Sequence, residues 1–377
     1  MNSTAVLDRD TGRLPLPGPS ASSSTWSDFG CRVNARTPAE LFERYERSRF
    51  LYPAKRARLA PYRSLILENW QRARQAGELL LYEVSREEPD GGWASLTSWR
   101  STHAGWQTQH LVSSGTLLGG RAVMLAAQAV RAARAGRSGD VAQQNWFSPG
   151  NRFAALAFGG MTERIGPERS LIVPGAYVMV PAPLAAALRR GGRERPVVEL
   201  DGGACPELAG LARACRGEVY VRAEGLDRDD LRLDDVDRLY RLVGLRRHRR
   251  IWVQYDAGGR LRAAALAHRG PLGFNFSFLE NRCDLLVSPE LDEAEAQRAL
   301  DALIAAASTA YEDFEPGCVP VAGETPMDRL VRAGAEPVRP YTRALWLAEA
   351  YPDVYRHIDS LYARRLRGRG QHPRRTP

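Results

Sequence analysis

Hydrophobic and polar positions in the first half of the chain follow a clear order of elements. A short strand at 31–35 and a helical pattern over 38–75, interrupted near Pro53 and Pro61, come first. Alternating apolar positions then predict three strands, and later runs predict a helix, a strand, a second helix and a final strand. The expected ranges are strands 78–86, 93–101 and 106–113, helix 119–135, strand 141–147, helix 151–163 and strand 170–180.

The second half repeats this order. Its expected elements are strand 218–223, helix 234–248, strands 251–255, 261–268 and 274–287, helix 293–311, strand 318–322, helix 326–333 and strand 338–347. A repeat on this scale indicates an internal duplication. We therefore predict an α/β protein of two tandem domains, each closing its own mixed, mostly antiparallel sheet flanked by helices.

The predicted domains cover residues 29–182 and 217–348, with a linker at 183–216 and a closing helix at 349–366. Residues 1–28 are rich in Ser, Pro and Gly, and the basic tail at 367–377 has a similar composition. Segments of this kind bury too little apolar surface to order themselves, so both ends are expected to be disordered.

Charge narrows the choice of partners only slightly. The chain has 377 residues and a net charge of +9, and Lys55 is the only lysine among its 53 lysine and arginine residues. A positive field attracts CoA, nucleotides, nucleic acid or anionic lipid without selecting among them. The arginines are scattered, with no zinc-finger spacing and no basic patch interleaved with aromatics, which does not favour nucleic acid.

Cysteine spacing and hydropathy bear on metal content and location. The five cysteines show no spacing typical of a zinc site or a redox dithiol, so reduced thiols and no bound metal are expected. No apolar run approaches the ~20 residues of a membrane span, and the N-terminal segment lacks the regions of a secretory signal. These features predict a cytoplasmic protein without a membrane partner.

Several segments resemble those of the GNAT acetyltransferase superfamily. Residues 285–290 are similar to the GNAT strand that leads into the CoA-binding helix, and 327–338 to its closing helix and final strand. Residues 119–122 resemble its phosphate loop, and 151–158 its Asn-x-x-Ala-x-x-x-Tyr helix. The resemblance implies N-acyl transfer that uses acetyl-CoA or another acyl-CoA, with a small-molecule or peptide amine as the acceptor.

The candidate CoA site lies in the first half, where a glycine-rich segment precedes a helix. Unpaired N–H groups and partial positive charge at a helix start suit a pyrophosphate. A glycine-rich turn that caps an ordinary helix is the alternative, because the loop is about two residues short and Leu118 stands where the family has Gly. The candidate residues are Ser113, Ser114, Gly115, Gly119, Gly120, Arg121 and Asn151.

The second half differs at the matching positions. Glu295 and Gln297 stand where phosphate-contacting glycines belong, and Asp292 and Glu293 come just before them. Carboxylates repel a pyrophosphate, and side chains prevent close approach of the backbone. We expect this half to bind no CoA.

Acyl transfer to an amine needs a base and a proton donor for the thiolate. The family's donor tyrosine corresponds to Phe158, so Tyr177 or Tyr82 is considered instead, although either suits a half-buried strand. His110, at the end of the strand that approaches the CoA loop, is the candidate base. Glu83 is a second candidate acting through water. A packed histidine and an exposed strand acid are the respective alternatives.

Two polar groups are further candidates for a ligand pocket. Gln143, Asn145 and Phe147 share a strand face, and Asn275 to Asp284 combine polar groups with aromatics, as in a ligand cleft, an interface or a solvated sheet edge. A non-catalytic tandem binding or scaffold protein is the alternative function, and an aminoacyl or peptidyl transferase is a third. The acceptor, the acyl group and the oligomeric state stay open at this point.

Overall fold

The computed structural model describes residues 26–370 apart from 104, 115–116, 139–141, 192–195, 325–326 and 339. Of the segments predicted to be disordered, 1–25 and 371–377 lie outside the described part, whereas 26–28 and 367–370 are helical, so the prediction is wrong for these residues. Strands of the first half are β1 (Arg32–Val33), β2 (Leu81–Glu87), β3 (Trp93–Arg100), β4 (Gly105–Ser114), β5 (Ala142–Phe147) and β6 (Ser170–Pro181). Those of the second half are β7 (Val197–Glu199), β8 (His248–Tyr255), β9 (Leu261–Arg269), β10 (Cys283–Val287), β11 (Cys318–Gly323), β12 (Glu336–Pro337) and β13 (Tyr341–Leu347).

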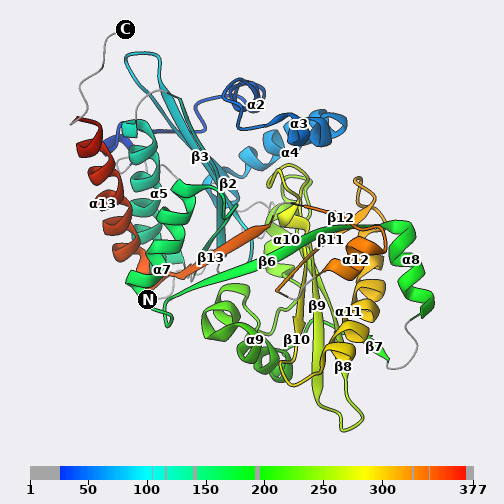
Figure 1. The fold of residues 1–377 in the computed structure, drawn as a ribbon. Coiled ribbons are helices and arrows are strands. Elements are labelled where there is room, and N and C mark those ends of the chain that lie inside the picture. Colours follow the sequence, from blue (N-terminus) through cyan, green and yellow to red (C-terminus); the bar gives the residue numbers. More distant parts are fainter. Residues whose placement is uncertain are drawn as a thin grey trace, which may run out of the picture.

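All of these strands belong to one sheet, because the closing strands of the two halves are exchanged. The order is β1-β2-β3-β4-β5-β13-β6-β11-β10-β9-β8-β7, with β12 beside β6. Strand β13 lies between β5 and β6, with Ala344 opposite both Asn145 and Ile172. Strand β6 continues into the second half, where Val178 pairs with Val321 of β11. Figure 1 shows β6 and β13 crossing the middle of the molecule.

The prediction that each half closes its own sheet is therefore wrong. Without β13 beside β5 and β6 beside β11, these two strands would each present an open edge, and unpaired edge N–H and C=O groups need partners. Each edge instead pairs with the last strand of the other half. Side-chain alternation shows which residues face the core, but it does not identify the neighbouring strand.

Helices cover both faces of this sheet. They are α2 (Pro38–Arg47), α3 (Pro53–Leu59), α4 (Arg63–Gln75), α5 (Leu117–Ser138), α6 (Arg152–Ala154), α7 (Gly160–Ile165), α8 (Ala182–Gly191), α9 (Pro206–Glu224), α10 (Asp234–Arg241), α11 (Glu293–Ala307), α12 (Asp328–Arg332) and α13 (Tyr351–Gly370). In Figure 1, α5, α7 and α13 lie on one side of β2 and β3, and α2, α3 and α4 lie on the other. In β9, Ala263, Ala265 and Ala267 join the core that includes α11, whereas Ala264 and Leu266 join the core that includes α9.

Local sequence explains where several helices begin. Thr37 and Glu40 form a capping box at the start of α2, in which each side chain bonds the backbone N–H of the other residue. Asp292 caps α11 by accepting from the N–H of Glu295 at 2.7 Å. Pro53 occupies the first turn of α3, where no intrahelical N–H bond is lost.

Two predicted strands of the second half are corrected. Residues 218–223 belong to helix α9, which kinks at Gly217 with a φ of 80°. Their run of Val219, Tyr220 and Val221 is typical of a strand, but burial on nearly all sides overrides that propensity. Within the predicted strand 274–287 only β10 is extended. The segment before it contains the 3₁₀ helix Leu279–Asn281 and packs its aromatic side chains into the core. The predicted linker at 183–216 contains most of α8, β7 and the first part of α9.

A buried ionic network lies where the two halves meet. Glu224 of α9 accepts from Arg282 at 2.9 Å, contacts Arg249 at 3.4 Å and pairs with Arg343 of β13. Arg282 also reaches Asp284 at 2.8 Å. These side chains are at most 2% exposed. Arg343 additionally donates to Gln144 of β5 at 2.8 Å, so the network spans both halves.

Candidate functional site

The parallel strands of each half separate soon after they begin. Strands β4 and β5 pair only from Gly105–Gln107 to Ala142–Gln144. Strands β10 and β11 pair only from Cys283–Asp284 to Val321–Ala322. Beyond these pairs the two strands of each half diverge, and no other described strand lies in the gap between them.

The gap of the first half opens into a cavity of about 250 Å³. Its walls come from β4, the end of β5, the π-helical turn after α6, the segment before and within α3, the loop at 275–277 and the first residue of β13. Gln109 bridges the closed end of the gap by donating to the carbonyl of Trp146 at 3.0 Å. The cavity thus lies at the junction of the halves, and segments far apart in the sequence form it.

His110 lines this cavity at an irregular point of β4. The pairing with β3 shifts between Ser95 and Thr97, and His110 has a φ of 57°, which is uncommon for a residue with a side chain. A bulge of this kind redirects a side chain. The imidazole is 4% exposed and stacks on Phe276 with ring centroids 4.1 Å apart.

The surroundings of His110 keep the imidazole neutral. Burial, followed by the positive charge of Lys55, holds its pKa well below the usual value. Neither ring nitrogen has a hydrogen-bond partner among the described residues. A buried polar group without a partner is costly, so a ligand in the cavity would find an imidazole ready to accept or donate a hydrogen bond.

Asn151 and Phe158 also line the cavity. Asn151 caps α6 by accepting from the N–H of Ala154 at 3.2 Å, which is a structural role in addition to its place in the wall. Phe158 lies in the π-helical turn Ala155–Gly159 and stacks on Trp346 at 6.1 Å. The position predicted from the resemblance to hold a donor tyrosine is thus an apolar ring in the cavity wall.

The residues predicted to form a phosphate loop, 119–122, lie at the start of helix α5, which begins at Leu117. A Cβ at Gly119 would lie 3.1 Å from the Cβ of Ala94, and one at Gly120 would lie 3.0 Å from the hydroxyl of Tyr362. These glycines allow α5 to pack closely on β3 and α13. Ser113 and Ser114 end β4, and Gly115 lies outside the described residues.

Other groups already lie around the start of α5. Arg121 donates to Asp359 of α13, with its Nε 2.9 Å from the carboxylate. The Glu88 carboxylate lies 3.2 Å from where a Cβ of Gly119 would be. A phosphate at this helix start would have to compete with Asp359 for Arg121 and would meet the charge of Glu88.

Tyr177 and Glu83 are not among the described residues that line the cavity. The Tyr177 hydroxyl donates to the carbonyl of Ser277 at 2.6 Å, and burial raises its pKa well above the usual value. Glu83 is fully buried, so the alternative of an exposed strand acid is wrong. Burial raises the pKa of Glu83 to about 7, although Arg74 and Ser85 oppose the shift.

The gap of the second half is filled by side chains of α9. Arg216 donates to the carbonyl of Leu285 at 3.2 Å, and the Cys215 thiol lies 3.2 Å from the carbonyl of Val287. The kink at Gly217 directs both side chains toward β10. Only about 10 Å³ of space remains beside Arg216, which is about the room of one water.

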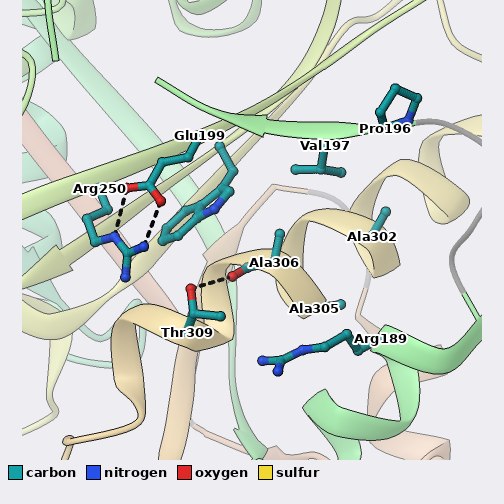
Figure 2. Close-up of a pocket in the computed structure, with 10 residues that line it drawn as sticks. Arg189, Pro196, Val197, Glu199, Arg250, Ala302, Ala305, Ala306 and Thr309 are labelled. Atoms are coloured by element: carbon teal, nitrogen blue, oxygen red, sulfur yellow. Dashed lines mark hydrogen bonds and ion pairs between the residues drawn. The ribbon is translucent and has the colours of Figure 1, made fainter. Parts of the chain in front are cut away.

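A second cavity, of about 700 Å³, lies between β7, β8 and α11 (Figure 2). Ala302, Ala305 and Ala306 form one wall, and Arg250 opposite them makes a two-pronged pair with Glu199 at 2.8 and 2.6 Å. Because this arginine is already satisfied by a carboxylate, the pair explains its position without a ligand.

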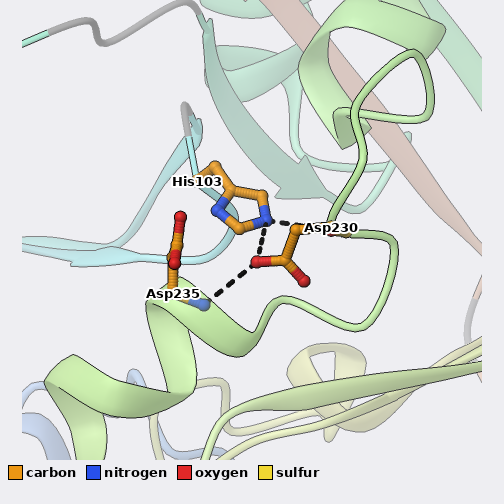
Figure 3. A group of neighbouring side chains, drawn as sticks. All are labelled: His103, Asp230 and Asp235. Carbon is orange, nitrogen blue, oxygen red and sulfur yellow. Dashed lines mark hydrogen bonds and ion pairs between the residues drawn. The ribbon is translucent and has the colours of Figure 1, made fainter. Parts of the chain in front are cut away.

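Two groups of side chains have the composition of metal ligands, and other contacts account for both. In Figure 3 His103 contacts Asp230 at 3.1 Å, and the Asp230 carboxylate also accepts the N–H of Asp235 at 3.0 Å. This contact ties the turn between β3 and β4 to the start of α10. The second group, Glu224, His268 and Asp284, has arginines on both carboxylates.

Phe276 belongs to the predicted polar and aromatic group, but sequence reasoning did not single out Lys55, Ser277 and Tyr341, which also line the cavity. The hydroxyls of Ser277 and Tyr341 lie 2.6 Å apart. The polar and aromatic composition of 274–284 was the one available signal, because it allowed either a ligand cleft or an interface. Nothing in the pattern around Lys55 or Tyr341 separates them from other surface residues.

Comparison with known proteins gives structural likeness without sequence matches. No protein-family model and no curated protein matches the chain. A tandem GNAT protein from the clavulanic acid biosynthesis pathway is 15% identical, with 75% of this chain and 88% of that one covered and a TM-score of 0.37. A GCN5-related N-acetyltransferase-like protein from Streptococcus suis is 12% identical over 82% and 99% of the chains, with a TM-score of 0.37. One from Kribbella flavida is 13% identical over 67% and 86%, with a TM-score of 0.32.

All three chains are less than 25% identical and have TM-scores below 0.5, so they carry no argument about the family, the residue roles, the activity or the substrate of this chain. None of the helices that the structure describes has the length and apolar composition of a membrane span.

Proposed function

We propose that the chain is an acyl-CoA-dependent N-acyltransferase of two GNAT-like halves, with its reaction in the cavity of the first half. The contrast between the two gaps carries this proposal. In the first half the gap leads to a cavity lined by His110, whereas in the second Arg216 and Cys215 occupy it. One half keeps room for a substrate, and the other has become a structural partner.

The free edge of β4 suits the donor. Beyond Gln107 this strand pairs with no described strand on the β5 side, although the Gln109 side chain crosses there to the carbonyl of Trp146. An extended arm that carries amides, such as the pantetheine of CoA, would bind to such an edge as an added strand does. In the second half Arg216 and Cys215 take the matching carbonyls of Leu285 and Val287.

His110 is the proposed base. In the reaction the amine nitrogen attacks the thioester carbonyl, the C–S bond breaks, and the amine proton must be removed. A buried imidazole with a lowered pKa is unprotonated at neutral pH and has a lone pair available. A lowered pKa makes the imidazole a weaker base, which is tolerable because the attacking amine becomes strongly acidic as the C–N bond forms.

Tyr341 is the proposed proton donor to the thiolate. Phe158 occupies the family position of the tyrosine, while Tyr341 lines the same cavity and its hydroxyl lies 2.6 Å from that of Ser277. Tyr177 lies behind it, with ring centroids 6.0 Å apart, and donates to a backbone carbonyl. The donor would then come from the exchanged strand β13.

Acetyl-CoA titration by calorimetry, combined with chromatographic detection of free CoA in the presence of amines, tests this function. We expect one equivalent bound per chain. His110→Phe should keep the affinity for acetyl-CoA and reduce turnover at least about 100-fold. Tyr341→Phe should reduce turnover less, and Tyr177→Phe, the matched control, should leave it unchanged. Two equivalents per chain, or no binding, would contradict the proposal.

A non-catalytic binding protein is the alternative function. The pairing of Arg121 with Asp359, and the closeness of Glu88 to the start of α5, favour it. In that case a ligand should bind in the cavity while acetyl-CoA neither binds nor is consumed with any amine.

A further inference from the structure

The cavity of the first half has no acidic group among its described wall residues. The wall consists mainly of aromatic rings, amides and hydroxyls, and Lys55, the charged member among the described ones, is a cation. An ammonium ion that leaves water needs a carboxylate or several hydrogen-bond acceptors, because an unpaired buried charge is costly. The described wall therefore provides no counter-charge for the protonated form of an ordinary amine.

His110 is a neutral hydrogen-bonding group in this wall. The side chain is 4% exposed, and neither ring nitrogen has a hydrogen-bond partner among the described residues. Phe276 is stacked on it at 4.1 Å, and the rings of Tyr45 and Phe50 both lie 5.8 Å away. Burial among rings without a carboxylate disfavours the imidazolium and lowers the pKa.

A neutral imidazole of this kind cannot take the proton of an alkylammonium ion. An alkylammonium resembles the lysine side chain, so transfer of its proton to even an ordinary imidazole is unfavourable by about 10⁴-fold. The lowered pKa of His110 makes the transfer less favourable still. The imidazole can nevertheless accept a hydrogen bond from an uncharged N–H group, and it can remove the proton once the nitrogen has been acylated.

We propose that the acceptor of this site is an amine that is uncharged in neutral solution, such as an aromatic amine, a hydrazine or an O-alkylhydroxylamine, on an aromatic body. This inference rests on the proposed function and narrows it to one class of acceptor. The uncharged nitrogen attacks the thioester carbonyl, and the thiolate leaves with the electrons of the C–S bond. The nitrogen then loses one proton to His110 and the thiolate gains one, which gives the N-acyl product and free CoA.

The size and lining of the cavity suit an aromatic body. Its volume is about 250 Å³, and an apolar cavity of about 150 Å³ is enough to hold benzene. Phe153, Phe158 and Phe276 are among the rings that line it. A single-ring acceptor therefore fits with space left for the acyl end of the donor.

Two probes that differ only in charge test the inference by calorimetry on the full-length chain. O-Benzylhydroxylamine is uncharged at pH 7, whereas phenethylamine, in which a methylene replaces its oxygen, is an ammonium ion. We expect the uncharged probe to bind about 10-fold or more tightly at pH 7. From pH 7 to pH 9 the affinity for phenethylamine should rise by about 10-fold per unit, as its neutral fraction does.

The uncharged probe also serves as the control for titration of the wall itself. The titratable members of the described wall are His110, Lys55, Tyr52 and Tyr341. The affinity for O-benzylhydroxylamine should be constant over the same pH range. Equal affinities at pH 7, a constant affinity for phenethylamine from pH 7 to pH 9, or binding of neither probe would overturn the inference.

Asn275 allows the missing counter-charge to be added to the wall. Its amide oxygen accepts from the N–H of Ser277 at 2.8 Å and from that of Leu279 at 3.4 Å. Asn275→Asp keeps an oxygen in this role, and the two N–H donors favour the ionised carboxylate. This variant should bind phenethylamine about 10-fold more tightly than the wild type at pH 7.

Asn281→Asp is the matched control, because it lies in the same segment but not among the described wall residues. It should leave both affinities unchanged. An unchanged ratio of the two affinities in a folded Asn275→Asp protein would contradict the inference. If either variant fails to fold, the comparison of the two probes on the wild type still decides.

Kinetics separate this inference from the proposed function. With acetyl-CoA at pH 7, kcat/KM for O-benzylhydroxylamine should exceed that for phenethylamine by about 100-fold or more, since only about one alkylamine molecule in 2,500 is uncharged at this pH. Equal values would overturn the inference and leave the proposed acyl transfer intact. Preferential binding of the uncharged probe without release of CoA would refute the proposed function and leave the preference of the cavity standing.

Discussion

Glu224 is the centre of the ionic network that joins the halves, and its replacement by the equally sized glutamine tests that network. The carboxylate is fully buried and paired with Arg343, with Arg282 at 2.9 Å and with Arg249 at 3.4 Å. Burial alone would raise its pKa, but these three arginines reverse the shift and hold the pKa at about 2, below its ordinary value of 4.5.

The magnitude follows from that difference in pKa. A carboxyl group ionising this much more easily in the folded than in the unfolded chain contributes roughly 3 kcal/mol to stability at neutral pH. Glu224→Gln also leaves buried guanidinium groups short of a counter-charge, and breaking a buried pair costs about 3–5 kcal/mol. With the unfolding entropy typical of a chain this long, Tm should fall by about 4–7 °C at pH 7.

The sign of the pH dependence is fixed by the direction of the shift. Because the folded pKa is lowered, the contribution of Glu224 is present above the unfolded value near 4.5 and is lost as the pH falls toward 2. The difference in Tm between the wild type and Glu224→Gln should therefore be constant from pH 7 to about pH 5 and should narrow below that. Differential scanning calorimetry at pH 7, 5, 4 and 3 measures it.

Two variants serve as controls. Combining Glu224→Gln with Arg343→Met removes a partner left without its counter-charge, so the double variant should lose less stability than the sum of the single changes. Asp235→Asn, in the exposed pair with Arg238, should leave Tm unchanged. A Glu224→Gln protein within 1 °C of the wild type at pH 7, or a difference that persists unchanged at pH 3, would refute the reasoning.

Three further predictions concern the first half. Gly120→Ala should destabilise the fold by about 1–3 kcal/mol in urea titrations, because the added Cβ would lie 3.0 Å from the Tyr362 hydroxyl. The control is Gly91→Ser, where the added Cβ has open space but the φ of 82° strains the backbone, so its loss of stability reports strain without a clash. Arg121→Ala should cost less than about 1 kcal/mol, since its pair with Asp359 is partly exposed; a large loss of acetyl-CoA affinity in the same variant would show that phosphate displaces Asp359. Glu83→Gln should raise Tm at pH 8 and have little effect on Tm at pH 4. The reason is that a folded pKa of about 7 makes the wild type lose stability as the pH rises from 4.5 to 7. A lower Tm for Glu83→Gln than for the wild type at pH 8 would contradict this.

The candidate site was only partly within reach of sequence reasoning. His110, Asn145 and Asn151 were identified from their positions near the ends of predicted elements, and all three line the cavity. Glu83 and Tyr177 were plausible from residue type but lie outside the described wall, because strand alternation does not reveal how far a side chain is from a gap two strands away. Lys55 and Tyr341 reach the same cavity from opposite ends of the chain.

The sequence by itself determined the order of helices and strands in the first half and most of those in the second, because hydrophobic periodicity reflects which side of each element faces a core. It also placed Gly119 and Gly120 near the start of α5 and Asp292 and Glu293 at the start of α11. Only the tertiary structure decided that β6 and β13 exchange places, that Gly119 and Gly120 allow helix packing, and that α9 fills the second gap. Strand partners, glycine contacts and gap-filling side chains depend on residues distant in the sequence, such as Tyr362 for Gly120 and Leu285 for Arg216, and local pattern carries no information about such contacts.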